Sequence, residues 1–307
     1  MLRPRNGLFR LPANRQMLAN WQDTYAELAV LRYIHSMKVP PVVLSIAGFD
    51  PSSGAGITAD IKTAAVNGCY AVACPTALTV QSSQGVFEVR PLDPDFVRRT
   101  VRALAEDLEI AAVRVGMLGS AVVATTVAST LKTLELRNIV VDPVLRSSSG
   151  TALLDESGVE ALRQELLPLA HVITPNLAEA AGLAGIEAAP IHAPWEEVLP
   201  WLRTTAAKLR GLGSRAVVIT GGHLLEANDY LSYVENGMVR EEVFAGTHIG
   251  SGSTHGTGCA FAMSIACQLA LGQELPQAVR GAKEYVRRAV ETAYPLGKGI
   301  GPINHMV

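Results

Sequence analysis

The residues that best suggest chemistry lie in Gly250–Leu271, where a stretch rich in glycine, serine and threonine ends at Cys259 and an apolar run follows. That run is long enough for about three and a half helical turns. The first amides of a helix lack partners within it and carry partial positive charge, so a glycine-rich turn entering a helix can bind phosphate. A thiol at the helix entrance is expected to have a lowered pKa and to act as a base. We therefore expect a phosphate donor and a hydroxyl acceptor to meet here, although the glycine spacing alone fits a plain helix start equally well.

Two polar side chains elsewhere suit an acceptor. Asp60 falls on the helix predicted after the loop Gly48–Gly56, where its carboxylate could accept a hydrogen bond from a hydroxyl group. Gln81 ends a predicted strand, and its side-chain amide can both donate and accept hydrogen bonds. The alternatives are an exposed helix carboxylate for Asp60 and a strand-end cap for Gln81.

Short apolar runs alternate with helical patterns along the chain, which predicts βαβ units and a mainly parallel sheet. Asp95 is expected to cap one of the helices. Asn236-Gly237 predicts a hairpin near the end of the sheet. Ligands of such sheets bind beyond the carboxyl ends of the strands. The predicted strand ends carry most of the unusual residues: Gly48-Phe49-Asp50, Gln81, Gly116-Met117, Asp142-Pro143, Thr174-Pro175-Asn176 and Thr220-Gly221-Gly222.

The composition limits the classes of function. The chain has 307 residues, of which 49% are hydrophobic and 18% charged, so a sizeable core is expected. A net charge of −2 gives no field to attract nucleic acid or anionic lipid. No apolar run approaches the roughly 20 residues that span a bilayer. The four cysteines form no zinc-site spacing, and so few in a chain of this size fit a reducing cytoplasm.

Residues 1–36 are expected to form an extension outside the catalytic fold, and residues 37–307 a single domain. The extension begins with four arginines and no acid within its first 20 residues. An organelle presequence, an amphipathic helix and an upstream start codon all remain open as explanations.

Taken in order, the motifs resemble those of the hydroxymethylpyrimidine/phosphomethylpyrimidine kinases of the ribokinase-like superfamily. The resemblance runs from about Val42 to His305. It implies a three-layer α/β/α fold with a mainly parallel central sheet, and phosphorylation of a pyrimidine hydroxymethyl group with ATP and Mg²⁺. The motifs that carry it are Ala47-Gly-Phe-Asp-Pro-Ser-Ser-Gly-Ala-Gly-Ile-Thr-Ala-Asp60, Gly116-Met-Leu, Asp142-Pro-Val, Thr174-Pro-Asn-Leu-Ala-Glu-Ala180, Gly221-Gly-His, Thr254-His-Gly-Thr-Gly-Cys259 and Gly297-Lys-Gly-Ile-Gly-Pro-Ile-Asn-His305.

The resemblance also implies roles for individual residues. Cys259 would take the proton from the acceptor hydroxyl, while the amides of Gly256, Thr257, Gly258 and Cys259 hold the transferring phosphoryl group. Gly48, Ala55, Asp60, Gln81 and Met117 would bind the pyrimidine, although a methionine is equally suited to filling a core. Asp142 and Glu179 would organise Mg²⁺, mostly through water. Asn176, Thr220 and Gly222 would face the nucleotide, and Lys283 is a further candidate.

The chain departs from the family pattern at two positions where relatives often carry lysine, Thr220 and the vicinity of Ser148. Arg146 could compensate for the missing charge. A pyridoxal/pyridoxine kinase remains an alternative, because related enzymes share the Gly-Thr-Gly-Cys ending, and so does a nucleotide- or pyrimidine-binding sensor without catalytic activity. Relatives are commonly dimers, so a homodimer is expected.

Overall fold

The apolar runs form the strands of one nine-stranded sheet in a computed structural model, which describes residues 39–147 and 150–307. The spatial order of the strands is β3-β2-β1-β4-β5-β6-β7-β8-β9. The six strands from β2 to β7 in that order run parallel, whereas β3, β8 and β9 join the sheet through antiparallel pairs at its two edges. The bounds are Val42–Phe49 (β1), Tyr70–Ser82 (β2), Gly85–Pro91 (β3), Ile110–Val115 (β4), Ile139–Val141 (β5), Val172–Ile173 (β6), Ala216–Ile219 (β7), Asp229–Glu235 (β8) and Met238–Phe244 (β9).

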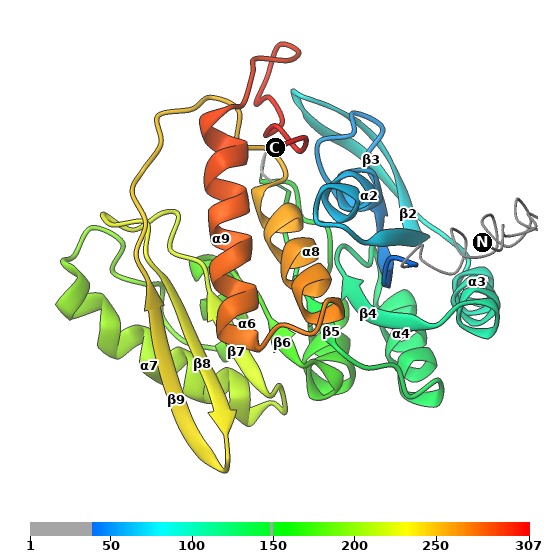
Figure 1. Ribbon diagram of the computed structural model, residues 1–307, viewed down its shortest axis with the longest axis horizontal. Helices are drawn as coiled ribbons and strands as arrows, with labels where there is room; N and C mark the ends of the chain where they lie inside the picture. The colour runs from blue at the N-terminus through cyan, green and yellow to red at the C-terminus, as the bar shows by residue number, and fades with distance from the viewer. Residues whose placement is uncertain (1–38, 148–149) are drawn as a thin grey trace, which may run out of the picture. The chain divides into compact units, whose positions relative to one another are not determined.

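Helices cover both faces of the sheet, which confirms the predicted three-layer fold (Figure 1). One apolar cluster joins the sheet to α3, α4, α6 and α7, and a second joins it to α2, α8 and α9. None of the helices in the described ranges is long and apolar enough to cross a membrane. The bounds are Gly56–Val66 (α2), Pro94–Asp107 (α3), Ala121–Thr133 (α4), Glu156–Ala161 (α5), Leu177–Ala184 (α6), Trp195–Gly211 (α7), Thr257–Ala270 (α8) and Leu275–Glu291 (α9).

Two local features differ from the sequence-based expectations. Strand β3 was not predicted, because its turn with β2 consists of Ser83 and Gln84 and lacks the Asn-Gly signal that marks β8 and β9. Helix α3 is capped by Asp93 and not by Asp95, since the Asp93 carboxylate accepts from the Phe96 amide at 2.9 Å. Pro94 then takes the first helical position, where a missing N–H costs nothing.

The residues described from Pro41 onward form one compact unit. Residues 1–36, and with them the predictions about an N-terminal extension, lie outside the described residues.

The pleat of the sheet determines which polar side chains approach the site. Successive strand residues point to opposite faces. In β4, Val113 and Val115 join the cluster with α3 and α4, so Arg114 points to the opposite face, toward α2 and α8. Ser45 of β1 is the registered partner of Arg114. One polar layer therefore lies between the sheet and the two helices that begin at the glycine-rich loops.

Candidate active site

The entrance of α8 has the geometry expected of an anion-binding turn. Its first flanking residue, Gly256, is in the left-handed conformation with φ +89°, and none of the described side chains caps the helix. A Cβ atom built on Gly256 would lie 1.8 Å from the carbonyl oxygen of Gly54. Only glycine fits this position, because any side chain would push the two glycine-rich loops apart. Thr257 and Gly258 follow in the first turn, leaving amides that point out of the helix.

The other glycine-rich loop is built around Asp50. Its carboxylate accepts from the amides of Ser52 at 2.8 Å, Gly54 at 3.2 Å and Ala55 at 2.9 Å. The same carboxylate pairs with His255 Nε2 at 2.9 Å. His255 directly precedes Gly256, so this contact ties the Asp50 loop to the phosphate-binding turn.

Arg114 lies at the centre of the polar layer and was not predicted as a site residue. Its side chain is fully buried, with Nη1 3.1 Å from Asp60 Oδ2 and Nη2 2.5 Å from Asp142 Oδ2. The charge of Arg114 also acts on the thiol of Cys259. The structure thus brings together three predicted residues that are far apart in sequence, Asp60, Asp142 and Cys259.

Asp60 is not the exposed helix carboxylate that was the alternative expectation, since it is 0% exposed. Ser45 Oγ donates to its Oδ2 at 2.6 Å, and Oδ1 is buried without a partner among the described residues. Burial raises the pKa of Asp60 to about 6, against the opposing charge of Arg114. Oδ1 is therefore one acceptor atom to which none of the described residues donates.

The expectation of a lowered thiol pKa is wrong. Cys259 is partly exposed, yet burial of the sulfur raises its pKa to about 11, and the charges of Asp142 and Asp60 add to the effect. Arg114 and the backbone of Gly56 oppose this rise without overcoming it. The helix terminus alone led to the expectation, because the sequence did not show that two carboxylates would converge on the thiol. The free protein therefore holds a neutral thiol near pH 7.

The two predicted metal residues lie close enough to influence each other. Burial raises the pKa of Asp142, and burial together with the charge of Asp142 raises the pKa of Glu179 to about 8. A methyl group built on Gly258 would lie 4.0 Å from both Asp142 carboxylate oxygens, which places this carboxylate beside the phosphate-binding turn. Two carboxylates that resist ionisation in each other's presence fit a hard divalent cation, because its charge favours their ionised form. No cluster of three or more His, Cys, Asp or Glu side chains suited to a metal occurs in the described residues, so water and phosphate oxygens would complete the shell.

The predicted nucleotide residues fall into two groups. Asn176 caps α6, and its side chain and that of Glu179 each accept from the other's amide, at 2.9 and 3.0 Å. Thr220 forms a parallel bridge with Asn176, so these residues lie side by side. Gly222 is exposed, and no atom of the described residues lies within 4 Å of where its Cβ atom would stand.

Lys283 belongs to the second group and is already in an ion pair. Its Nζ lies 2.7 Å from Asp229 Oδ2, and Asp229 Oδ1 accepts from the Gly221 amide at 2.9 Å. Lys283 therefore supports the turn at Gly221 through Asp229. Arg146 is exposed and donates to the carbonyl oxygen of Gly150, and Ser148 lies outside the described residues.

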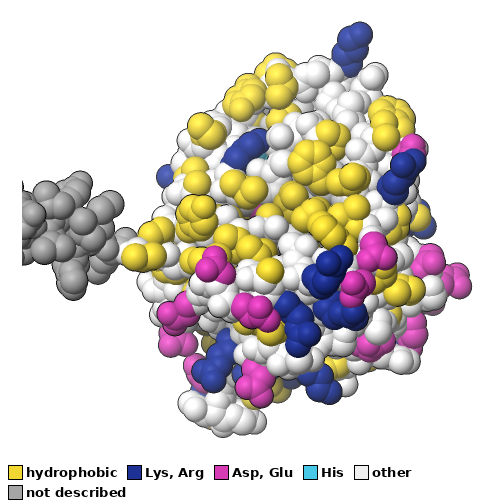
Figure 2. Space-filling model, turned by 90° about the vertical axis from the view of Figure 1, so that its right-hand side faces the viewer, with side chains coloured by type: hydrophobic (Ala, Val, Ile, Leu, Met, Phe, Trp, Pro, Cys, Tyr) yellow, Lys and Arg dark blue, Asp and Glu magenta, His cyan; other side chains and the backbone are white. Residues whose placement is uncertain are grey.

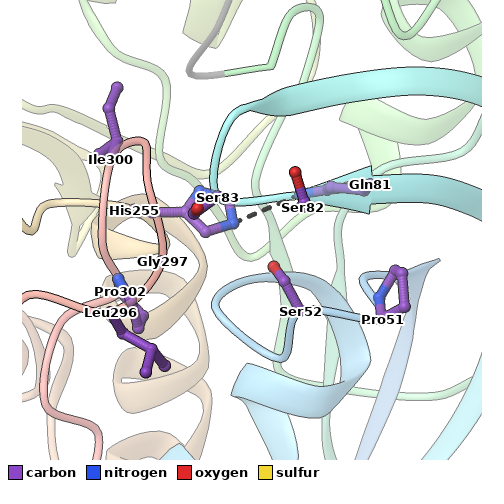
Figure 3. A pocket seen from close by; sticks show the side chains of 10 residues that line it. All are labelled: Pro51, Ser52, Gln81, Ser82, Ser83, His255, Leu296, Gly297, Ile300 and Pro302. Carbon is purple, nitrogen blue, oxygen red and sulfur yellow. Dashed lines mark hydrogen bonds between the residues drawn. The ribbon is translucent and has the colours of Figure 1, made fainter.

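Gln81 lines a pocket of about 350 Å³ between the tip of the β2–β3 hairpin, the Asp50 loop and the segment from Leu296 to Pro302. Its Nε2 lies 3.4 Å from His255 Nε2 (Figure 3). Cys259, Asp60 and Met117 do not line this pocket, so Gln81 is separated from the other residues predicted to bind the acceptor. Met117 packs against Gly48, where a Cβ atom would lie 2.8 Å from its sulfur, and Ala55 precedes α2.

Two residues of this arrangement were missed, Arg114 and His255. A signal for Arg114 was present, because it interrupts a run predicted to be a buried strand, and a buried charge needs a partner. His255 carried no such signal, since its partner Asp50 lies 205 residues away.

Known proteins resemble this chain in sequence and in fold. The model of the phosphomethylpyrimidine kinase family matches residues 50–304. A hydroxymethylpyrimidine/phosphomethylpyrimidine kinase of Streptomyces coelicolor is 42% identical over 266 residues, covering 87% of this chain and 94% of the relative. A crystal structure of a phosphomethylpyrimidine kinase from Clostridium difficile is 34% identical with a TM-score of 0.69, covering 81% of this chain and 99% of that one. The ADP complex of Bacillus subtilis pyridoxal kinase is 33% identical with a TM-score of 0.75, covering 87% and 97%.

The family model covers most of the chain, and the relative from Streptomyces aligns over nearly its whole length. The resemblance drawn from the motifs is thereby confirmed, together with the ribokinase-like fold. This chain belongs to the phosphomethylpyrimidine kinase family.

Proposed function

We propose that this protein transfers the γ-phosphoryl group of ATP to the hydroxymethyl group of 4-amino-5-hydroxymethyl-2-methylpyrimidine and then to its monophosphate, in thiamine biosynthesis. The observation that carries the proposal is the convergence of Cys259, Arg114, Asp60 and Asp142 at the uncapped entrance of α8. Phosphoryl transfer depends mostly on positioning and charge stabilisation, and this arrangement supplies both.

Each residue has a proposed task. The amides of Gly256, Thr257, Gly258 and Cys259 hold the transferring phosphoryl group. The Cys259 sulfur, ionised after its own proton has passed to a neighbouring carboxylate, receives the acceptor proton as the new P–O bond forms and the bond from the γ-phosphorus to ADP breaks. Removal of one hydrogen-bond donor of the kind that these amides provide typically lowers the rate by about 10²–10³-fold. The free Oδ1 of Asp60 accepts from the pyrimidine.

The remaining proposed contacts hold the two substrates. Gln81 pairs with the aminopyrimidine edge, with Gly48, Ala55 and Met117 beside the ring. Asn176, Thr220 and Gly222 face the nucleotide, and Lys283 supports their loop through Asp229. Asp142 and Glu179 would hold Mg²⁺, which when bound neutralises charge on the phosphates.

An ADP-release assay with purified protein tests the proposal. The acceptors are the hydroxymethylpyrimidine, its monophosphate and pyridoxal, each measured with wild type and with Cys259→Ser. Pyridoxal is the second candidate acceptor, because it also carries a primary alcohol on a heteroaromatic ring and the fold is shared with pyridoxal kinases. We expect turnover of both pyrimidines and much weaker turnover of pyridoxal. Turnover of pyridoxal alone would reverse the assignment, and ligand binding without turnover would indicate a sensor.

We also propose a cytoplasmic homodimer. Exposed hydrophobic side chains gather on the face that carries α2, β2 and β3 (Figure 2), among them Ile61, Leu78, Val80 and Phe87. Leu78 and Val80 lie two residues apart on β2 and so share one face of the hairpin. Sedimentation should give twice the chain mass, and Leu78→Glu combined with Val80→Glu should give the mass of one chain. A wild-type protein that sediments as a monomer at tens of micromolar would contradict the dimer.

A further inference from the structure

We propose that Arg114 is a positioning residue that serves both substrates at once. One end of its guanidinium holds Asp60 for the pyrimidine, and the other end holds Asp142 for the metal and nucleotide. This inference rests on the proposed kinase function and adds to it a residue that joins the two halves of the site.

The geometry of Arg114 supports a shared role. The side chain is 0% exposed and comes from the carboxyl end of β4, on the face that packs against α2 and α8. Nη1 reaches Asp60 on α2 at 3.1 Å, and Nη2 reaches Asp142, which follows β5, at 2.5 Å. A planar guanidinium has separate donors for separate partners, whereas an ammonium is a single point charge.

The surrounding backbone leaves room for this side chain. A Cβ atom built on Gly116 would lie 2.0 Å from Arg114 Nη1 and 2.6 Å from its Cζ. The guanidinium therefore occupies the space that a side chain at residue 116 would take. Ser45, registered beside Arg114, completes the hold on Asp60 through a 2.6 Å hydrogen bond.

The positive charge of Arg114 compensates two buried carboxylates. Asp60 and Asp142 are both buried, and each is paired with the same cation. Removing one partner from a buried pair is costly, because it leaves the other charge without compensation. Loss of Arg114 would release both carboxylates at once, whereas loss of Asp60 would affect the acceptor side alone.

The test is a kinetic comparison of wild type with Arg114→Met, Arg114→Lys and Asp60→Asn, using the hydroxymethylpyrimidine and titrated Mg²⁺. We expect Arg114→Met to raise both the acceptor KM and the half-saturating Mg²⁺ concentration by about tenfold or more. Arg114→Lys keeps the positive charge but lacks the separate donors of the guanidinium. Its kcat should therefore be much closer to that of wild type than the kcat of Arg114→Met, while the acceptor KM or the half-saturating Mg²⁺ concentration, or both, stay raised. Asp60→Asn should raise the acceptor KM and leave the Mg²⁺ requirement within twofold.

Val113→Ala is the matched control, because Val113 is a buried neighbour on β4 that points to the opposite face. It should lower the urea midpoint and leave both constants within twofold. If Arg114→Met does not fold, the double variant Arg114→Met/Asp60→Asn replaces it, since it removes one charge of each sign. In that double variant the Mg²⁺ requirement should still be raised about tenfold.

The outcomes separate the two proposals. Absence of pyrimidine turnover by wild type would refute the proposed function. Turnover by wild type, with both constants unchanged in Arg114→Met or equally shifted in Val113→Ala, would refute the role of Arg114 alone. A shift of only one constant in Arg114→Met would also refute it, because a shared positioning residue must move both.

Discussion

Replacing Gly256 with alanine tests whether the turn before α8 holds the transferring phosphoryl group. Gly256 has φ +89°, and an added Cβ atom would lie 1.8 Å from the carbonyl oxygen of Gly54. Real Cβ contacts are essentially never shorter than 3.0 Å, so the two loops must separate by about 1.2 Å, the difference between these distances. A misplacement of about 1 Å at a catalytic site can cost about 10²-fold in rate.

The matched control is Gly272→Ala, beyond the other end of the same helix. Gly272 has φ +83°, and within residues 39–147 and 150–307 no atom lies within 4 Å of its added Cβ atom. Alanine in the left-handed conformation costs about 1–2 kcal/mol at either position. Overpacking adds about 1–3 kcal/mol at Gly256 only. Urea unfolding should therefore show a larger loss of stability for Gly256→Ala than for Gly272→Ala.

The decisive assay is ADP release with the hydroxymethylpyrimidine. It is run without urea, at a temperature at which circular dichroism shows both variants to be folded. We expect Gly256→Ala to lower kcat by about 10²–10³, because the phosphoryl-holding amides move, and Gly272→Ala to stay within threefold of wild type. A Gly256→Ala enzyme with kcat within threefold of Gly272→Ala would show that the turn does not hold the phosphoryl group.

Three other predictions follow from the charges and the packing of the site. Cys259→Ser should lower kcat by about 10²-fold with an acceptor KM near that of wild type, as expected of a proton acceptor; an unchanged kcat would remove the thiol from the chemistry. The pKa of Glu179 is raised from 4.5 to about 8, so this group stabilises the fold below pH 4.5 and loses that contribution as the pH rises to 8. Urea midpoints at pH 6 and pH 9 should accordingly differ less in Glu179→Gln than in wild type. Gly116→Ala should displace the Arg114 guanidinium and raise the Mg²⁺ requirement, whereas an unaltered requirement would mean that Arg114 adapts without consequence.

The sequence was sufficient to predict the layers of the fold and the edge of the sheet where the site lies. Strand β1 and helix α8 were predicted because their apolar runs are bounded by glycines, and β8 and β9 because Asn236 and Gly237 mark their turn. Capping by Asp93 instead of Asp95 shows how adjacent candidates compete for one helix end. Pro94 distinguishes them, because proline favours the first helical position and so places the cap at Asp93.

The electrostatics of the site could not be predicted in the same way. The pKa of Cys259 depends on Asp60 and Asp142, which approach it from α2 and from the end of β5. Their distances are set by the pleat of the sheet and by the guanidinium between them. The helix terminus, which favours a lowered thiol pKa, is the one influence visible in the sequence. Burial of the sulfur raises the pKa of Cys259 and outweighs that influence.

The raised pKa of Cys259 also bears on which group contributes most to the rate. With a pKa of about 11, only about one thiol in several thousand is ionised near pH 7.5. A neutral thiol can receive the acceptor proton only after its own proton has shifted toward a neighbour, so its contribution is limited. Backbone amides at the start of α8 carry their partial charge at every pH. The loss of rate in Gly256→Ala should therefore equal or exceed that in Cys259→Ser, and the opposite order would mean that the sulfur is ionised in the working complex.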